Sequence, residues 1–236
     1  MRGDLSLPTT LDTCLEGVDA VFLLWPGLPL DAAAAVLDAV SKHARRIVYL
    51  SSLSVRDDLA EPPDPITALH ADLEQLIKRS GLEWTVLRSS GMATNTLGWA
   101  QQIRTEGVVR WPYGAAARSL IHEGDIASVA VRALQSPGHG GATYLLTGPE
   151  ALTHVEQAQT IGKVIGRTLR YEEISREAAR RQMLTYWPPA LVEGALDAWA
   201  SFVGEPEVVS HTVEAVTGTP ARAFHQWASD HESAFR

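Results

Sequence analysis

Two titratable side chains, His70 and Glu74, have types and a spacing that could do chemistry. They lie four residues apart in a predicted helix, so they share one face of it. A histidine gains or loses a proton near neutrality, and a nearby carboxylate favours the charged ring. The pair is therefore a candidate proton donor. The alternative is a solvent-exposed pair beside an apolar stripe, which would only stabilise the helix slightly.

Small polar and turn-forming residues follow three predicted strands. In an open parallel sheet, ligands bind beyond the carboxyl ends of the strands, where small side chains allow a flat ligand to approach the backbone. These positions are therefore candidate binding residues, although Ser and Gly also end strands and cap helices without any ligand. The candidates are Leu24, Trp25, Pro26, Ser51, Ser52, Leu53, Ser89 and Ser90.

Alternating strands and helices must position these residues. Apolar runs at 18–24, 46–50 and 84–88 predict buried strands. An Ala-rich segment that follows Asp31 to about residue 43, and an amphipathic segment at about 67–80, predict the helices between them. This alternation predicts an α/β fold with a parallel sheet. Asp31 and Asp125 are expected to cap helices. Further along, we expect helices at 11–15, 94–105, 126–135, 153–166, 175–185, 189–203 and 220–234, and short strands near 108–111, 119–122, 141–147 and 169–174.

Composition excludes several classes of protein. The 236 residues are 45% hydrophobic and 20% charged, with a net charge of −8, which argues against binding to nucleic acid. Cys14 is the single cysteine, and no Cys/His spacing indicates zinc. His122 and Asp125 lack a second histidine one turn away, so we expect no metal site. The longest apolar run, 21–29, is too short to cross a membrane, and we expect a soluble cytoplasmic protein.

The order of several motifs resembles the NmrA-like branch of the atypical short-chain dehydrogenases/reductases. The motifs are CLEGVDAVFLL, RRIVYLSS, SGLEWTVLRSS, IHEGDIASVAVRAL and ATYLLTGPEALTHVEQAQTIGKVIGR. The resemblance implies a Rossmann-like domain over 1–150 that binds NAD or NADP, and a small, mostly helical substrate lobe over 151–236. It also implies that the strand-end candidates contact the cofactor, and that Asp4 and Leu5 keep the family's adenine-side turn.

The beginning of the chain departs from the family pattern. Residues 2–5 align with the end of the family's third strand, so the first strand and the Gly-rich turn that holds the phosphates are absent from this chain. We estimate that roughly 40–60 residues are missing, since one βαβ unit alone takes roughly 30 or more. We therefore expect an N-terminally truncated fold in which 18–24 is an exposed edge strand. Either another chain or element, such as a second copy in a homo-oligomer, covers this edge, or the native protein begins upstream.

A second departure concerns catalysis. The wider superfamily uses a Tyr followed four positions later by a Lys, whereas the matching helix here carries His70 and Glu74. We expect a hydride-linked proton transfer through His70, with the exposed pair as the alternative. An apolar substrate pocket is expected from several aromatic and neighbouring residues, which in the alternative interpretation belong to a half-buried core. The pocket candidates are Met92, Asn95, Trp111, Tyr113 and Trp187.

Three functions remain open from the sequence. The first is an NAD(P)H-dependent oxidoreductase acting on a small or medium apolar carbonyl, quinone or enone. The second is a non-catalytic regulator that senses NAD(P) or binds a protein. The third is a shortened chain with impaired cofactor binding. The preference between NAD and NADP is not readable, because the residues that normally decide it precede this sequence.

Overall fold

The structure is a computed structural model that describes residues 2–59 and 61–236, and these form two compact units. The first unit contains the chain up to Ser89 and Ala127–Leu145, and the second contains Ser90–Ile126 and Leu146–Arg236. The division after residue 150 that the sequence predicted stays a prediction. Each unit consists of two separate stretches of the sequence, and the helix that begins at Glu123 contributes residues to both units.

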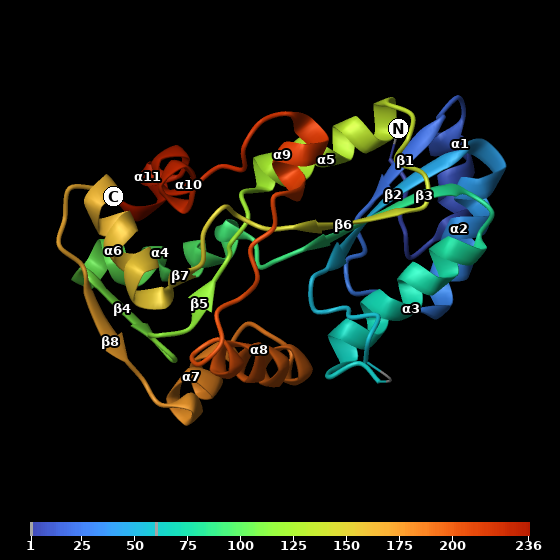
Figure 1. The fold of residues 1–236 in the computed structure, drawn as a ribbon. Coiled ribbons are helices and arrows are strands. Elements are labelled where there is room, and N and C mark those ends of the chain that lie inside the picture. Colours follow the sequence, from blue (N-terminus) through green and yellow to red (C-terminus); the bar gives the residue numbers. More distant parts are fainter. Residues whose placement is uncertain (1, 60) are drawn as a thin grey trace. The chain divides into compact units, whose positions relative to one another are not determined.

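A four-stranded sheet in the order β1-β2-β3-β6 forms the centre of the first unit (Figure 1). β1 pairs with β2 and β2 with β3, both in parallel, which confirms the predicted α/β class. In this register Tyr49 lies beside Val86, and Ser51 beside Arg88. The strands are β1 (Ala20–Leu23), β2 (Arg46–Ser52), β3 (Glu83–Ser89) and β6 (Ala142–Leu146).

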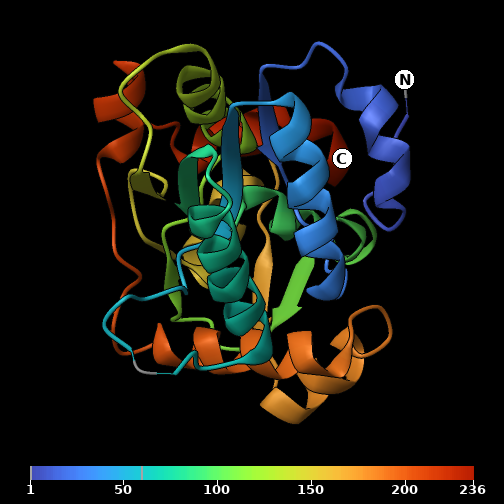
Figure 2. The same cartoon turned by 90° about the vertical axis from the view of Figure 1, so that its right-hand side faces the viewer.

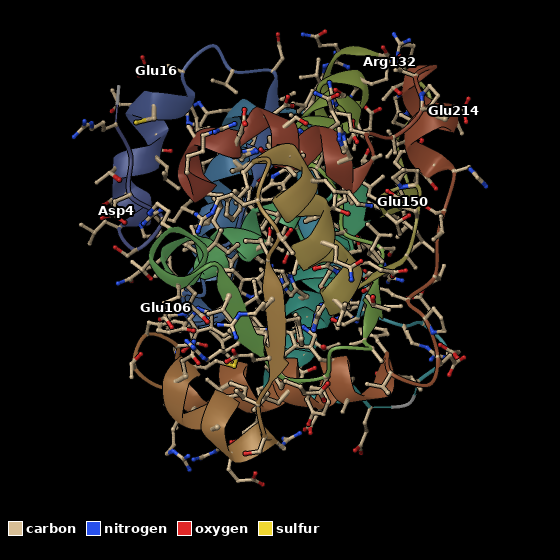
Figure 3. All side chains as sticks on the ribbon, turned by 90° about the vertical axis from the view of Figure 1, so that its left-hand side faces the viewer. Asp4, Glu16, Glu106, Arg132, Glu150 and Glu214 are labelled. Carbon is tan, nitrogen blue, oxygen red and sulfur yellow. The ribbon has the colours of Figure 1, made fainter. Side chains whose placement is uncertain are left out.

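Among the described residues β1 is an edge strand, as the sequence predicted. The expected strand end at residues 2–5 is wrong. Asp4 instead closes a turn, because its Oδ1 accepts hydrogen bonds from the Ser6 backbone (2.8 Å) and hydroxyl (2.6 Å). A single antiparallel bridge to Leu7 completes that turn. Asp4 is exposed on the outside of the N-terminal segment (Figure 3). Truncation of the native protein stays a prediction.

Helices α2 (Asp31–His43) and α3 (Pro65–Arg79) lie side by side against one face of this sheet (Figure 2). Short segments η1 (Pro8–Thr10) and α1 (Leu11–Leu15) pack beside α2. The side chain of Asp64 caps α3 by accepting from the backbone of its first turn. The expected cap at Asp31 is wrong, since that residue is already the first of α2, and the preceding residue makes no side-chain cap.

The second unit is mostly helical, with two small two-stranded sheets, β4 with β8 in parallel and β5 with β7 antiparallel. Its core is one apolar cluster that includes Trp227, Met183 and Phe235. The elements are η2 (Ala93–Trp99), α4 (Ala100–Glu106), β4 (Val108–Trp111), β5 (Ala117–Arg118), β7 (Leu152–Thr153), α6 (His154–Val164), β8 (Arg170–Glu173), α7 (Arg176–Met183), α8 (Pro189–Ser201), α9 (Thr212–Thr217), α10 (Phe224–Asp230) and α11 (Glu232–Phe235).

The shared helix α5 (Glu123–Gln135) begins two residues before the position that the sequence predicted as its cap. The cap expected at Asp125 is wrong, because its buried carboxylate binds the backbone N–H (2.7 Å) and the guanidinium of Arg222. His122 Nδ1 instead accepts from the backbone N–H of Gly124 at 2.9 Å. This imidazole supplies the acceptor for the first turn of α5.

Candidate functional site

A tyrosine–histidine pair joins β2 to α3 in the first unit. Tyr49 is fully buried (0% exposed), and its hydroxyl lies 2.7 Å from Nδ1 of the half-buried His70. Tyr49 takes this position because alternate side chains of β2 face the apolar layer that α3 covers. The pair therefore anchors the ring of His70 at its Nδ1 edge.

Burial sets the charge of both partners. It lowers the pKa of His70, and this outweighs the upward effects of Glu74 and Asp64. Burial also raises the pKa of Tyr49, with a smaller upward contribution from the charge of Glu74. The expectation that Glu74 favours a charged His70 therefore has the right direction but is outweighed. Both members of the pair are mostly neutral at neutral pH.

Glu74 belongs to a buried ion-pair network and makes no hydrogen bond with His70. It is 1% exposed, and its Oε1 accepts from the Ser51 hydroxyl (2.7 Å) and from Arg88 Nε (2.9 Å). Its Oε2 accepts from Arg88 Nη2 (2.7 Å) and from Lys78 Nζ (3.2 Å). Burial pushes the pKa of Glu74 up, but these hydrogen bonds outweigh it and hold the pKa below its ordinary value. The alternative of an exposed His–Glu pair is therefore wrong, because Glu74 lies inside.

Arg88 extends this network to the loop after β2, which the sequence analysis missed. Its Nη1 and Nη2 donate to the two carboxylate oxygens of Asp57, at 2.9 and 2.7 Å. The guanidinium is only 4% exposed and thus bridges two carboxylates. A charged residue within a buried strand requires charged partners, so the presence of Arg88 in a predicted strand could have indicated this network.

The hydroxyls at the ends of β2 and β3 are used within the protein. Ser51, Ser52, Leu53 and Ser89 come together there, since the backbone N–H of Leu53 donates to the Ser89 carbonyl at 2.8 Å. Ser52 pairs with the Ser54 hydroxyl at 2.7 Å, and Ser89 Oγ lies 3.5 Å from the Ser51 carbonyl. The edge thus presents small side chains whose hydroxyls already have partners.

The remaining cofactor candidates lie elsewhere. Ser90 belongs to the second unit, where its hydroxyl donates to the Ser119 carbonyl at 2.6 Å. After β1, Leu24 and Pro26 are exposed, and Trp25 Nε1 donates to the Leu28 carbonyl at 2.8 Å. Asp4 bonds within its own turn, and Leu5 packs on the apolar cluster beside α2.

The pocket candidates all belong to the second unit, and a shared substrate pocket stays a prediction. Trp111 is 8% exposed and packs on Trp199, with ring centroids 5.2 Å apart. It is thus a core residue, the alternative that the sequence left open. Tyr113 (φ 55°) and Trp187 are half-buried against the same core, whereas Met92 and Asn95 are exposed.

A buried histidine in that core was missed by the sequence analysis. His154 is 4% exposed and lies edge-on to Trp99 and Trp199, with centroids 6.0 and 5.7 Å away. Its Nδ1 lies 3.2 Å from the Pro112 carbonyl. Burial lowers its pKa to about 4, so the ring is neutral at neutral pH. The tryptophans that enclose it are far apart in sequence, so no local pattern reveals it.

Among the described residues, no three His, Cys, Asp or Glu side chains are grouped so as to hold a metal ion. Within the same part of the chain, every helix is too short or too polar to cross a bilayer.

Sequence comparisons identify related proteins over nearly the whole chain. The profile of a family described as NAD(P)H-binding matches residues 1–137. A (4-alkanoyl-5-oxo-2,5-dihydrofuran-3-yl)methyl phosphate reductase of Streptomyces griseus is 41% identical over 95% of this chain and 80% of its own length. An NAD(P)H azoreductase of Xenophilus azovorans is 34% identical over 99% of this chain and 82% of its own.

Solved structures show the same fold at lower identity. The NADPH complex of an NADPH-dependent quinone oxidoreductase of Escherichia coli has a TM-score of 0.80 at 21% identity, covering 97% of this chain and 82% of that one. A triphenylmethane reductase of Citrobacter has a TM-score of 0.80 at 18% identity, covering 98% and 82%. Both similarities confirm the Rossmann-like fold.

Proposed function

Because this chain belongs to the NAD(P)H-binding family of atypical short-chain reductases, we propose that it is an NAD(P)H-dependent reductase of small molecules. The observation that carries the proposal is 41% identity to a reductase over 95% of this chain. We further propose that its substrate is a small or medium, largely apolar carbonyl compound, quinone or enone.

The substrates named for the relatives support this class. The Streptomyces relative is named for a methyl phosphate ester of an unsaturated furan ring that carries an oxo and an alkanoyl group, so its compound joins a conjugated ring to a charged phosphate. The Xenophilus relative reduces azo compounds. Both substrates have an electron-poor double bond, which is what a hydride donor attacks. Quinones and enones have the same property.

The residues of this chain fit one part of NAD(P)H. At the ends of β2 and β3, Ser52, Leu53 and Ser89 are small or half-buried, which suits the approach of a nicotinamide ring and its ribose. The sequence contains no G-x-G-x-x-G turn between a strand and a helix, and therefore no phosphate cradle of that kind. We assign these three residues to the ring-and-ribose part of the cofactor.

His70 is the proposed catalytic residue. Bound NAD(P)H supplies the hydride. When a substrate accepted the hydride, negative charge would develop on the conjugated oxygen or nitrogen, and an N–H of His70 would donate a hydrogen bond to that atom. The lowered pKa of the half-buried ring means that it acts mainly as a neutral donor, so the proton that completes the reduction would come from water. Glu74 and Arg88 act as positioning residues, because their network holds α3 against the strands.

The test combines cofactor titration with turnover. Binding of NADH and NADPH is followed by nicotinamide fluorescence, and oxidation by loss of nicotinamide absorbance with a naphthoquinone, an azo dye and an unsaturated lactone. We expect turnover of at least one acceptor, and a loss of about 100-fold in kcat for His70→Gln. His139→Gln is the matched control, since His139 also pairs through Nδ1 with a tyrosine, Tyr144, at 2.8 Å.

The other outcomes separate the alternatives. Cofactor binding without turnover of any acceptor would favour a non-catalytic NAD(P) sensor. Failure to bind either dinucleotide would contradict the proposed function altogether. Turnover that His70→Gln leaves unchanged would remove His70 from the mechanism while keeping the reductase.

A further inference from the structure

The hydrogen bond between Tyr49 and His70 can run in two directions. In one, the phenol donates to an unprotonated Nδ1. In the other, an Nδ1–H donates to the phenol oxygen. The atoms are 2.7 Å apart in either case, so the surroundings of the phenol must decide between them.

Burial makes the second direction unfavourable. Tyr49 is fully buried, and the described residues provide its hydroxyl with no partner other than His70. If the phenol oxygen only accepted, its own proton would be buried without an acceptor, which is strongly unfavourable. When the phenol donates, its proton is satisfied.

We infer that Tyr49 is a positioning residue that donates to Nδ1 of His70 and so fixes the ring in the tautomer with its proton on Nε2. The inference concerns the resting protein, and its catalytic meaning rests on the proposed function. A neutral histidine protonated on Nε2 presents a hydrogen-bond donor at that nitrogen. Tyr49 would thus determine that His70 offers a donor, not an acceptor, to a ligand.

The exposed side of the ring agrees with this role. Nε2 has no hydrogen-bond partner within residues 2–59 and 61–236. The His70 side chain is half-buried, so part of its ring reaches the solvent. A proton fixed on Nε2 is therefore not used by any bond within the described residues.

The same bond predicts how His70 titrates. The charged groups that act on the ring are Glu74 on its own helix and Asp64 at the start of α3. Tyr49 adds a hydrogen bond to the neutral form alone, because an imidazolium has no lone pair on Nδ1 to accept it. Removing that bond should make the ring easier to protonate. If Nδ1–H were the donor, removing it should have the opposite effect.

The test is a histidine NMR titration of the whole protein labelled with ¹⁵N. His70 is identified among the eight histidines by comparison with His70→Gln. We expect the neutral wild-type ring to carry its proton on Nε2. In Tyr49→Phe the acid dissociation constant of the His70 imidazolium should fall about fivefold, the change expected when one net hydrogen bond is lost. Tyr144→Phe removes the equivalent partner of His139 and should leave His70 unchanged.

Three results would overturn the inference. The first is a neutral wild-type ring with its proton on Nδ1. The second is a stronger acid at His70 in Tyr49→Phe, and the third is no change of tautomer or of titration in that variant. The spectra need no substrate, so they are independent of turnover. In the reductase assay, Tyr49→Phe should lower kcat about fivefold while cofactor affinity stays unchanged. A change in affinity alone would indicate a purely structural role and contradict the positioning role.

Discussion

Replacing His154 by phenylalanine should remove an acid-sensitive element from the core of the second unit. The ring is enclosed by Trp99 and Trp199, and burial lowers its pKa to about 4. Phenylalanine keeps the aromatic packing. The Pro112 carbonyl, which loses the imidazole, still lies 3.2 Å from the Tyr171 hydroxyl, whose one proton it shares with the Trp111 carbonyl at 3.0 Å. The variant should therefore fold, and it lacks only the titrating group.

The magnitude follows from the two pKa values of His154. In the unfolded chain the ring titrates near 6.5, so between pH 6.5 and 4 the unfolded state binds more protons than the folded state. The contribution of the neutral His154 ring to the free energy of unfolding is fully present above pH 6.5. It is lost as the pH falls towards 4. The full loss is about 3 kcal/mol, of which about 2 kcal/mol falls between pH 7 and pH 5.

The assay is urea unfolding of both proteins at about pH 7 and about pH 5, followed by circular dichroism. Carboxylates also titrate in this interval, but they do so in both proteins, so the comparison between the proteins isolates His154. We expect the wild type to lose about 2 kcal/mol more than His154→Phe on acidification. His225→Phe, which alters an exposed histidine on α10, should behave like the wild type.

Equal pH dependence in the wild type and His154→Phe would refute this reasoning. It would mean that the ring titrates alike in the folded and unfolded states, and thus that it is hydrated in the folded protein. A loss of stability towards high pH that depends on His154 would refute it equally, because the expected sign is the reverse.

Three further outcomes follow from other sites. Glu74→Gln should lower the free energy of unfolding, measured in urea, by about 3 kcal/mol, because it weakens the pairing of buried Arg88. Glu232→Gln, which alters an exposed ion pair, should lower it by less than about 1 kcal/mol in the same assay. Gly148→Ala should lower the free energy of unfolding by about 3 kcal/mol, since its Cβ would lie 2.2 Å from the Leu120 carbonyl oxygen. Gly204 has open space around it, so Gly204→Ala should be within about 0.5 kcal/mol of the wild type. Turnover should stay level from about pH 7 to about pH 9, because the lowered pKa leaves His70 neutral throughout; a steady fall would show that an imidazolium delivers the proton.

Local patterns predicted the first unit better than the second. The boundaries of α1 agree with the sequence to the residue, and α2 begins at the residue that was predicted as its cap and ends at the predicted residue. The segment expected as one helix over 220–234 is instead α10 followed by α11, and α9 was not predicted. The short helices α10 and α11 are stabilised by tertiary packing around Trp227, which no local pattern encodes.

The site was only partly predictable for the same reason. His70 and Glu74 were found because they lie one turn apart in a single helix. Their actual partners, Tyr49 and Arg88, come from strands β2 and β3, and only the parallel register brings them beside α3. The sequence therefore identified the candidate residues but not their hydrogen-bond partners, which are Tyr49 on β2 for His70, and Ser51 on β2 and Arg88 on β3 for Glu74.

The state of the hydroxyls at the strand ends favours His70 as the group that meets a substrate. Ser51 donates to a buried carboxylate, Ser52 pairs with a neighbouring serine, and the Ser89 hydroxyl lies 3.5 Å from the Ser51 carbonyl. A ligand that used these hydroxyls would have to break bonds already made, and the gain would be small. Nε2 of His70 has no bond of this kind among the described residues, so a ligand there would replace only water and would break no bond within the protein. Ligand recognition at this edge should therefore depend more on the imidazole than on the serines, although serines dominate its sequence.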